Sequence, residues 1–133
     1  MRKLLCVQSS QEINRVLSES FQKFSVEAVC CSDPWDALKV GRRDYFHLAI
    51  IDLPRPVQAD APDGAELFYL FKNYQVYIPN VILLVESVAN YEHLIFEGVT
   101  QVVQRPVAIS LVVSLAMELL DYQELAQGGS LVA

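Results

Sequence analysis

Two residues of opposite charge, Asp52 and Arg105, have the clearest chemical potential in this sequence. Asp52 directly follows an unbroken apolar run at 48–51, and Arg105 follows a second apolar segment at 102–103. A carboxylate held at the end of a buried strand can accept a transferred group, bind a hard divalent cation or pair with a base. A guanidinium can grip a carboxylate or a phosphate in a bidentate fork. These two residues therefore mark the candidate site.

Cysteine and histidine chemistry is not expected to contribute. Cys6, Cys30 and Cys31 form an odd set without a C-x-x-C pair, which argues against a zinc knuckle or a disulfide framework and favours buried, reduced thiols. His47 falls at the start of a predicted strand and His93 within a predicted helix. We therefore expect neither histidine to bind a metal.

Five short apolar runs, separated by segments with helical spacing, must position these residues. The runs at 48–51 and 81–85 are apolar without alternation, which is typical of strands covered on both faces in a parallel sheet. The pattern predicts an α/β domain, a doubly wound (βα)5 sheet. The five runs are 4–7, 26–29, 48–51, 81–85 and 102–103.

Helix-capping residues mark where three of the helices begin. Each motif sets a side chain that accepts a hydrogen bond beside the first free backbone N–H groups. In such a sheet the working site lies at the carboxyl ends of the strands, where Gln8, Asp52, Glu86 and Arg105 are expected. The capping motifs are Ser9 with Glu12, Asp33 with Pro34, and Asp63 with Glu66.

The length and the net charge of the chain limit the kinds of partner that it can have. The chain has 133 residues, a formal net charge of −6 and a pI of about 4.8, which argue against nucleic acid or an anionic membrane as the main partner. No apolar run reaches the length of a transmembrane helix, and the first residues lack a signal-peptide block, so a cytoplasmic protein is expected. We predict one domain at 1–124 and a flexible tail, or the start of a linker, at 125–133.

In this element order the chain resembles the receiver domain of bacterial response regulators, over residues 3 to about 122. Asp52, with Pro56 four residues on and Asp63 before the third helix, is similar to the family's phosphoacceptor segment. Arg105-Pro106 stands where the family carries Lys-Pro. The resemblance implies the flavodoxin-like strand order 2-1-3-4-5 and a cis peptide bond at Arg105-Pro106.

The sequence also departs from the family at the positions that support phosphorylation. The acceptor carboxylate is kept, whereas the acidic pair that holds Mg2+, the hydroxyl residue, the lysine and the aromatic switch residue are all replaced. The replacements are Gln8 and Ser9 for the acidic pair, Val85 for the hydroxyl residue, Arg105 for the lysine and Val102 for the switch residue.

These replacements change the charge of the predicted site. The family's residues would carry about −2, which attracts a hard dication, whereas Asp52 and Arg105 sum to zero. We therefore expect an Asp52–Arg105 ion pair, no cofactor and no catalytic residue, with Mg2+ only if Asp52 is a working phosphoacceptor. Replacement metal ligands, if any, would be Asp60, Asp63 or Glu86.

The last predicted helix suggests a contact surface. Across 108–120 its only polar residues are Ser110, Ser114 and Glu118, a narrow stripe. Part of its apolar surface, such as Val113 and Met117, is therefore expected to meet another protein or a second copy of the chain, unless the helix is deeply packed. The resemblance implies a dimer or partner face made of the fourth helix, fifth strand and fifth helix, to which Tyr91 and Phe96 would add aromatic side chains.

Three functions follow from these observations. The first is a divergent receiver, a pseudo-receiver of a bacterial two-component (phosphorelay) system, which acts as a protein interaction module without Mg2+-dependent phosphorylation. The second is a working phosphoacceptor, phosphorylated on Asp52 by a histidine kinase. The third, a flavodoxin-like enzyme or nucleotide-binding protein, would need a glycine-rich loop after the first strand, and residues 8–11 contain no glycine.

Overall fold

The computed structural model describes residues 2–54 and 61–128, and in them the predicted α/β class is confirmed. The strands form one parallel sheet in the order β2-β1-β3-β4-β5, which confirms the order that the resemblance implied. Short apolar segments rich in Val, Ile and Leu favour such strands because both faces are buried. The strands are β1 (Arg2–Gln8), β2 (Val26–Cys31), β3 (Leu48–Asp52), β4 (Asn80–Val85) and β5 (Gln101–Gln104).

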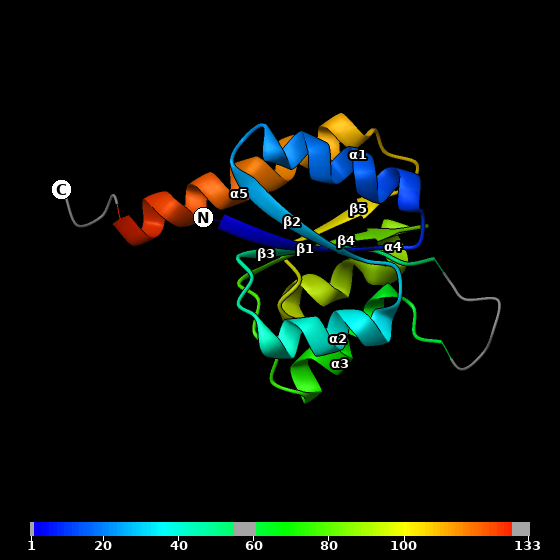
Figure 1. Cartoon of the computed structure of the whole chain (residues 1–133). Helices are drawn as coiled ribbons and strands as arrows, with labels where there is room; N and C mark the ends of the chain where they lie inside the picture. Colours follow the sequence, from blue (N-terminus) through cyan, green and yellow to red (C-terminus); the bar gives the residue numbers. More distant parts are fainter. Residues whose placement is uncertain (1, 55–60, 129–133) are drawn as a thin grey trace.

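Helices cover both faces of the sheet (Figure 1). One face carries α1 and α5, and the other carries α2, α3 and the α4 region. Alternate residues of β1 serve the two layers, since Leu4 and Cys6 pack toward α1 and α5 while Leu5 and Val7 pack toward α2 and α3. The helices are α1 (Gln11–Gln22), α2 (Pro34–Arg43), α3 (Gly64–Asn73), α4 (Val88–Tyr91) and α5 (Ile109–Gly128).

One predicted cap is wrong by a single residue. The N-cap of α1 is Ser10, whose Oγ accepts from the Ile13 amide at 3.3 Å, whereas the Ser9 hydroxyl donates to the Gln8 side chain. The physical reason is that Ser10 has the extended backbone that a cap requires. The Asp33 cap of α2 and the Asp63–Glu66 capping box of α3 are confirmed.

The fourth helical segment is shorter than a regular α-helix. After α4 the chain continues as a 3-10 helix, Glu92–Glu97, which ends at Gly98 with φ of 120°. Tyr91 thus closes α4 and Phe96 lies in the 3-10 helix. The His, Ile and Phe of this stretch are weak helix formers, which fits the break.

Helix α5 is long and continues past the predicted domain boundary. Residues 125–128 belong to α5, and the rest of the predicted tail, 129–133, lies outside the described residues. Val113 is only 8% exposed and packs in the core with Val112, Ala116 and Leu120, so its prediction as a free surface residue is wrong. Among the helices in the described ranges, none is long and apolar enough to cross a membrane.

Candidate functional site

The candidate site lies where the carboxyl ends of the central strands meet. Gln8 ends β1, Asp52 ends β3, and the two residues are register partners across the sheet. Arg105 follows β5, and its amide donates to the Val85 carbonyl at 2.7 Å, which fixes it beside the end of β4. Residues at the ends of four strands therefore lie close together at the carboxyl end of the sheet, which we call the Asp52 edge. The predicted topology requires this arrangement.

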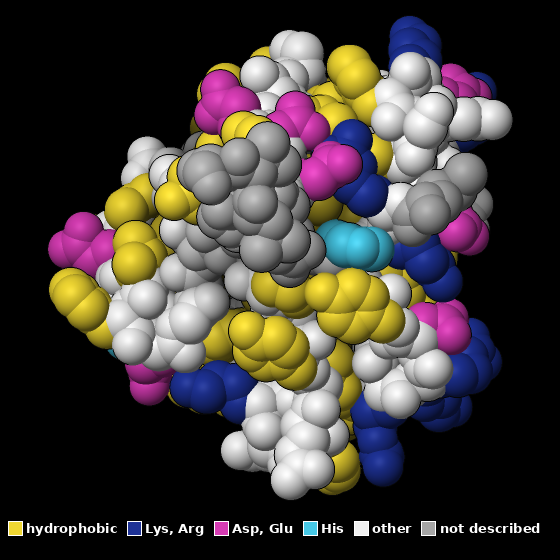
Figure 2. Space-filling view, turned by 90° about the vertical axis from the view of Figure 1, so that its left-hand side faces the viewer, with side chains coloured by type: hydrophobic (Ala, Val, Ile, Leu, Met, Phe, Trp, Pro, Cys, Tyr) yellow, Lys and Arg dark blue, Asp and Glu magenta, His cyan; other side chains and the backbone are white. Residues whose placement is uncertain are grey.

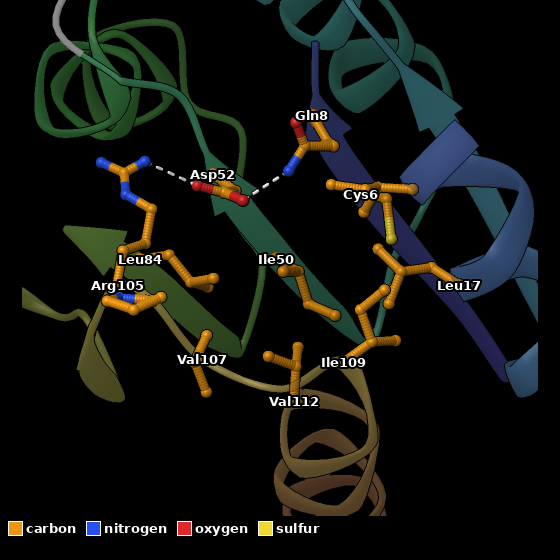
Figure 3. A pocket seen from close by; sticks show the side chains of 12 residues that line it. Cys6, Gln8, Leu17, Ile50, Asp52, Leu84, Arg105, Val107, Ile109 and Val112 are labelled. Carbon is orange, nitrogen blue, oxygen red and sulfur yellow. Dashed lines mark hydrogen bonds and ion pairs between the residues drawn. The ribbon is translucent and has the colours of Figure 1, made fainter. Parts of the chain in front are cut away.

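Each oxygen of the Asp52 carboxylate accepts a hydrogen bond (Figure 3). Arg105 Nη1 donates to Oδ1 at 2.7 Å, and Gln8 Nε2 donates to Oδ2. The side chains of Asp52 and Arg105 are only 17% and 23% exposed, so water screens this pair less than a surface ion pair. The ion pair expected from the sequence is present, with Gln8 as a second partner.

Burial and pairing act in opposite directions on the Asp52 carboxyl. Loss of solvent raises its pKa, while the Arg105 charge and the Gln8 hydrogen bond lower it. Burial is the largest of these causes, and the pKa lies above its ordinary value. The two donors therefore orient the carboxylate and only partly offset the cost of removing it from water.

Gln8 has a larger role than the sequence suggested. Its Oε1 accepts from the Ser10 amide at 3.1 Å and from the Ser9 hydroxyl at 3.5 Å, which orients the Nε2 group toward Asp52. The sequence reasoning treated Gln8 as a lost acidic residue and missed this bond. The register of the strands could have revealed this hydrogen bond, because Gln8 and Asp52 end neighbouring strands.

Two of the other replaced positions carry apolar side chains that pack in the core. Val85 and Val102 are both buried and belong to the core on the α2 and α3 side. They give the site apolar packing where the family carries a hydroxyl group and an aromatic ring. The Arg105-Pro106 peptide bond is cis, as the resemblance implied.

The residues at this edge do not fit a magnesium ion. The Asp52 oxygens are occupied by two donors, and the Asp63 carboxylate caps α3 through the Glu66 amide at 2.8 Å. Asp63 and the exposed Glu86 line a hollow of about 150 Å3 together with Arg105, whose charge disfavours a cation there. Asp60 lies outside the described residues. Over 2–54 and 61–128, no three His, Cys, Asp or Glu side chains are grouped to hold a metal.

An apolar cavity of about 260 Å3 lies below the Asp52 carboxylate, between the sheet, α1 and α5 (Figure 3). Cys6, Leu17, Ile50 and Val112 line it, with Asp52 and Arg105 at its polar side. The sequence analysis did not predict this cavity, because side-chain packing between separate elements leaves no local pattern. Its lining is suited to apolar groups.

The interface residues predicted from the sequence differ in exposure. Phe96 is 93% exposed, whereas Tyr91 and Met117 are half-buried against the core. On α5, Leu111 is 58% exposed and was not among the predicted residues, because α5 is apolar around most of its surface and periodicity does not separate its free face from its packed face. Phe96 and Leu111 are therefore apolar candidates that solvent can reach, and Ile95, Tyr122 and Leu125 on the same segments are exposed as well.

The end of the sheet away from Asp52 also carries apolar side chains. Figure 2 shows them gathered beside a histidine at the centre of that face. Tyr45 packs against His47 with ring centroids 5.0 Å apart, and His47 Nδ1 accepts from the Lys3 amide at 3.1 Å. Tyr77 is 79% exposed. The His47 side chain thus takes part in contacts that position the start of β1.

Comparison with known proteins gives matches among solved structures. No family model matches the chain, and no curated protein sequence matches it. The receiver domain of the Francisella response regulator 1452 superposes with a TM-score of 0.77 at 18% identity, covering 92% of this chain and 99% of that domain. A CheY-like receiver domain protein from Methanospirillum hungatei gives 0.76 at 19% identity, covering 93% and 97%.

A third structure comes from a family of redox sensors in the streptococci that evolved from two-component response regulators. It matches with a TM-score of 0.78 at 11% identity, over 96% of this chain and 54% of that one. The chain has the fold of a response regulator receiver domain. Within that receiver fold the chemistry must be read from the residues at the site, since one fold hosts many functions.

Proposed function

We propose that this chain is an atypical response regulator receiver domain, a pseudo-receiver of a two-component (phosphorelay) system in the cytoplasm. It acts as a protein interaction module, and its state does not depend on Mg2+-driven phosphorylation. The observation that carries the proposal is the Asp52 carboxylate, which holds Arg105 on one oxygen and Gln8 on the other.

The chemistry of phosphoryl transfer supports this reading. Transfer to a carboxylate needs a free oxygen and positive charge that stabilises the phosphoryl oxygens, which a metal ion ordinarily supplies. Here both Asp52 oxygens accept hydrogen bonds, and Gln8 and Ser9 bring no charge for a cation. The site therefore favours a closed ion pair, and we assign no catalytic residue to it.

The surface available to a partner follows from the edge strand. β5 is the last strand of the sheet, and Gln101 and Gln104 are exposed along it. The exposed apolar residues Phe96 and Leu111 lie on the segments that flank β5 in sequence. We propose that α4 with the 3-10 helix that follows it, β5 and α5 contact a second copy of the chain or a partner protein, without nucleic acid or membrane.

Amide NMR tests this function directly. Mg2+ and then beryllofluoride, a mimic of the aspartyl phosphate, are titrated into the wild type and into Asp52→Asn. We expect no saturable shifts at Asp52, Gln8 or Arg105 up to tens of millimolar metal. Saturable shifts that vanish in Asp52→Asn would overturn the proposal and make Asp52 a phosphoacceptor for a histidine kinase.

A further inference from the structure

Two of the cysteines face each other across neighbouring strands. Cys6 in the interior strand β1 and Cys30 in the edge strand β2 are register partners. Neighbouring strands lie about 4.8 Å apart, which falls inside the Cα separation of roughly 4.4–6.8 Å that a disulfide spans. Both side chains pack on the α1 and α5 side of the sheet, whereas Cys31 packs on the opposite side.

The two thiols influence each other and have one hydrogen-bond partner nearby. Cys30 Sγ donates to the Asn14 carbonyl at 3.6 Å, and a hydrogen bond between the Cys6 and Cys30 side chains acts on the pKa of both thiols. The bond from Cys6 lowers the pKa of Cys30, while that bond and burial raise the pKa of Cys6. Cys30 is thus the better thiolate of the pair, and Cys6 stays protonated.

Solvent also reaches the Cys30 sulfur more easily than the Cys6 sulfur. Cys30 is half-buried on an edge strand, and Cys6 is fully buried. Cys6 also lines the cavity of about 260 Å3 below Asp52, which gives its side chain space on the side away from β2 (Figure 3). A small oxidant therefore reaches Cys30 first, and Cys6 is placed to react second.

We propose that Cys6 and Cys30 form an oxidation site for hydroperoxides, in which Cys30 is attacked first and Cys6 closes a disulfide with it. Cys6 shares the cavity below Asp52, but the oxidation chemistry uses neither Asp52 nor Arg105 and does not depend on the proposed receiver function.

The chemistry balances with one peroxide for each disulfide. The Cys30 thiolate attacks one peroxide oxygen, so that an S–O bond forms and the O–O bond breaks, with water leaving after protonation when the oxidant is hydrogen peroxide. The Cys6 sulfur then attacks the Cys30 sulfur, an S–S bond forms, the S–O bond breaks, and a second water leaves. The two thiols lose two electrons and two protons to the peroxide, and a dithiol reductant reverses the reaction.

Oxidation also removes a contact that leads toward the Asp52 site. Once Cys30 has no thiol proton, its bond to the Asn14 carbonyl is lost. The Asn14 side chain donates to the Gln8 carbonyl at 2.9 Å, and Gln8 in turn donates to Asp52. The amide signals of Asn14 and Gln8 therefore serve as local reporters of the disulfide.

The test uses the reduced full chain treated with hydrogen peroxide, followed by intact mass and peptide mapping. We expect a mass loss of about 2 Da, a peptide that joins Cys6 to Cys30, and recovery of the starting mass with dithiothreitol. Cys31→Ser is the matched control and should keep this product. Cys30→Ser should abolish it, and Cys6→Ala should leave a sulfenic acid on Cys30 that dimedone traps.

Circular dichroism on each variant shows that it has folded, and the peptide map of Cys31→Ser decides the question even if Cys6→Ala does not fold, because the adjacent Cys30 and Cys31 share one peptide in the wild type. A disulfide that includes Cys31, a disulfide between two chains, or complete absence of the Cys6–Cys30 peptide would overturn the proposal. Unchanged Asn14 and Gln8 signals in the oxidised protein would overturn the contact path toward Asp52.

Discussion

Arg105 Nη1 lies 2.7 Å from Asp52 Oδ1 and so joins two residues that are 53 positions apart in the chain. Each residue stands at the end of a different strand, and their charges cancel at the edge where the receiver fold usually places its chemistry. Because burial still raises the pKa of Asp52, the pair orients the site more than it stabilises the fold.

The first prediction concerns the energy of this pair. Asp52→Ala removes the carboxylate and leaves the Arg105 guanidinium, only 23% exposed, without its bond to Asp52. We expect the free energy of unfolding to fall by about 1–3 kcal/mol, with folding retained. Urea titration of both single variants and of the double variant Asp52→Ala/Arg105→Ala measures the coupling.

The double variant should lose less than the sum of the two single losses, since neither partner is then left alone. Strict additivity would show that the two side chains do not interact in solution. If the chain works through partner binding, Asp52→Ala should also retain that binding.

The second prediction is a pH dependence. The native pKa of Asp52 is raised above its ordinary value of 3.8, so the native state holds this proton to higher pH than the unfolded chain. The resulting stabilisation is fully present below the unfolded pKa and is lost as pH rises through the native pKa. Asp52→Asn, which stays neutral, should therefore gain stability relative to wild type as pH rises through that window.

Urea titrations of the wild type and Asp52→Asn from about pH 3 to 7 measure this difference. A difference that moves in favour of the wild type with rising pH would show that Arg105 and Gln8 outweigh burial. The expected sign would then be reversed.

The third prediction is that metal binding can be rebuilt. The triple variant Q8D/S9D/R105K restores three carboxylates and one ammonium group, about −2 in total, at the ends of β1, β3 and β5. We expect it to show saturable Mg2+-dependent amide shifts near Asp52, whereas the wild type shows none. The matched control Q8N/S9N/R105K makes the same changes in size without adding carboxylates.

Equal Mg2+ responses in the triple variant and its control would contradict the charge argument. A folded triple variant that binds no Mg2+ would show that buried Val85 and the local backbone, in addition to charge, exclude the ion.

The fourth prediction separates the exposed residues of the 3-10 helix and α5 from a core residue of α5. Leu111→Glu and Phe96→Ser alter exposed residues and should weaken self-association or partner binding roughly tenfold while the fold is kept. Sedimentation velocity and a binding assay measure this, with Tyr77→Ser as the control at the far end of the sheet. Val113→Glu places a charge in the core and should instead unfold the chain.

Unchanged sedimentation and binding in both surface variants would remove α4, β5 and α5 as the contact surface. An equal loss in Tyr77→Ser would move that surface to the opposite end of the sheet.

The sequence was sufficient for the features that depend on local pattern. Unbroken apolar runs predict buried parallel strands, and Asp63 with Glu66 predicts a capping box, because both signals lie within a few residues. The Asp52–Arg105 pair followed from charge once the resemblance had placed both residues at one edge. These predictions required no knowledge of side-chain packing.

The features that were missed depend on contacts between distant elements. The bond from Gln8 to Asp52 needs the register of β1 and β3, and the Cys6–Cys30 contact needs the register of β1 and β2. Val113 was misplaced because α5 is apolar around most of its surface, so periodicity could not tell its packed face from its free face. Ser9 and Ser10 are adjacent hydroxyl residues, and only backbone geometry decides which one caps α1.

The ion pair between Arg2 and Asp121, at 2.7 Å, has a practical consequence for handling the protein. It holds the start of β1 beside the C-terminal half of α5, while Asp52 lies at the other end of the sheet, roughly 20 Å away along β1. A fluorescent reporter or a sensor surface attached near Arg2, or near the end of α5, would therefore leave the Asp52 edge facing solution. Tethered binding measurements can then sample that edge without interference from the attachment point.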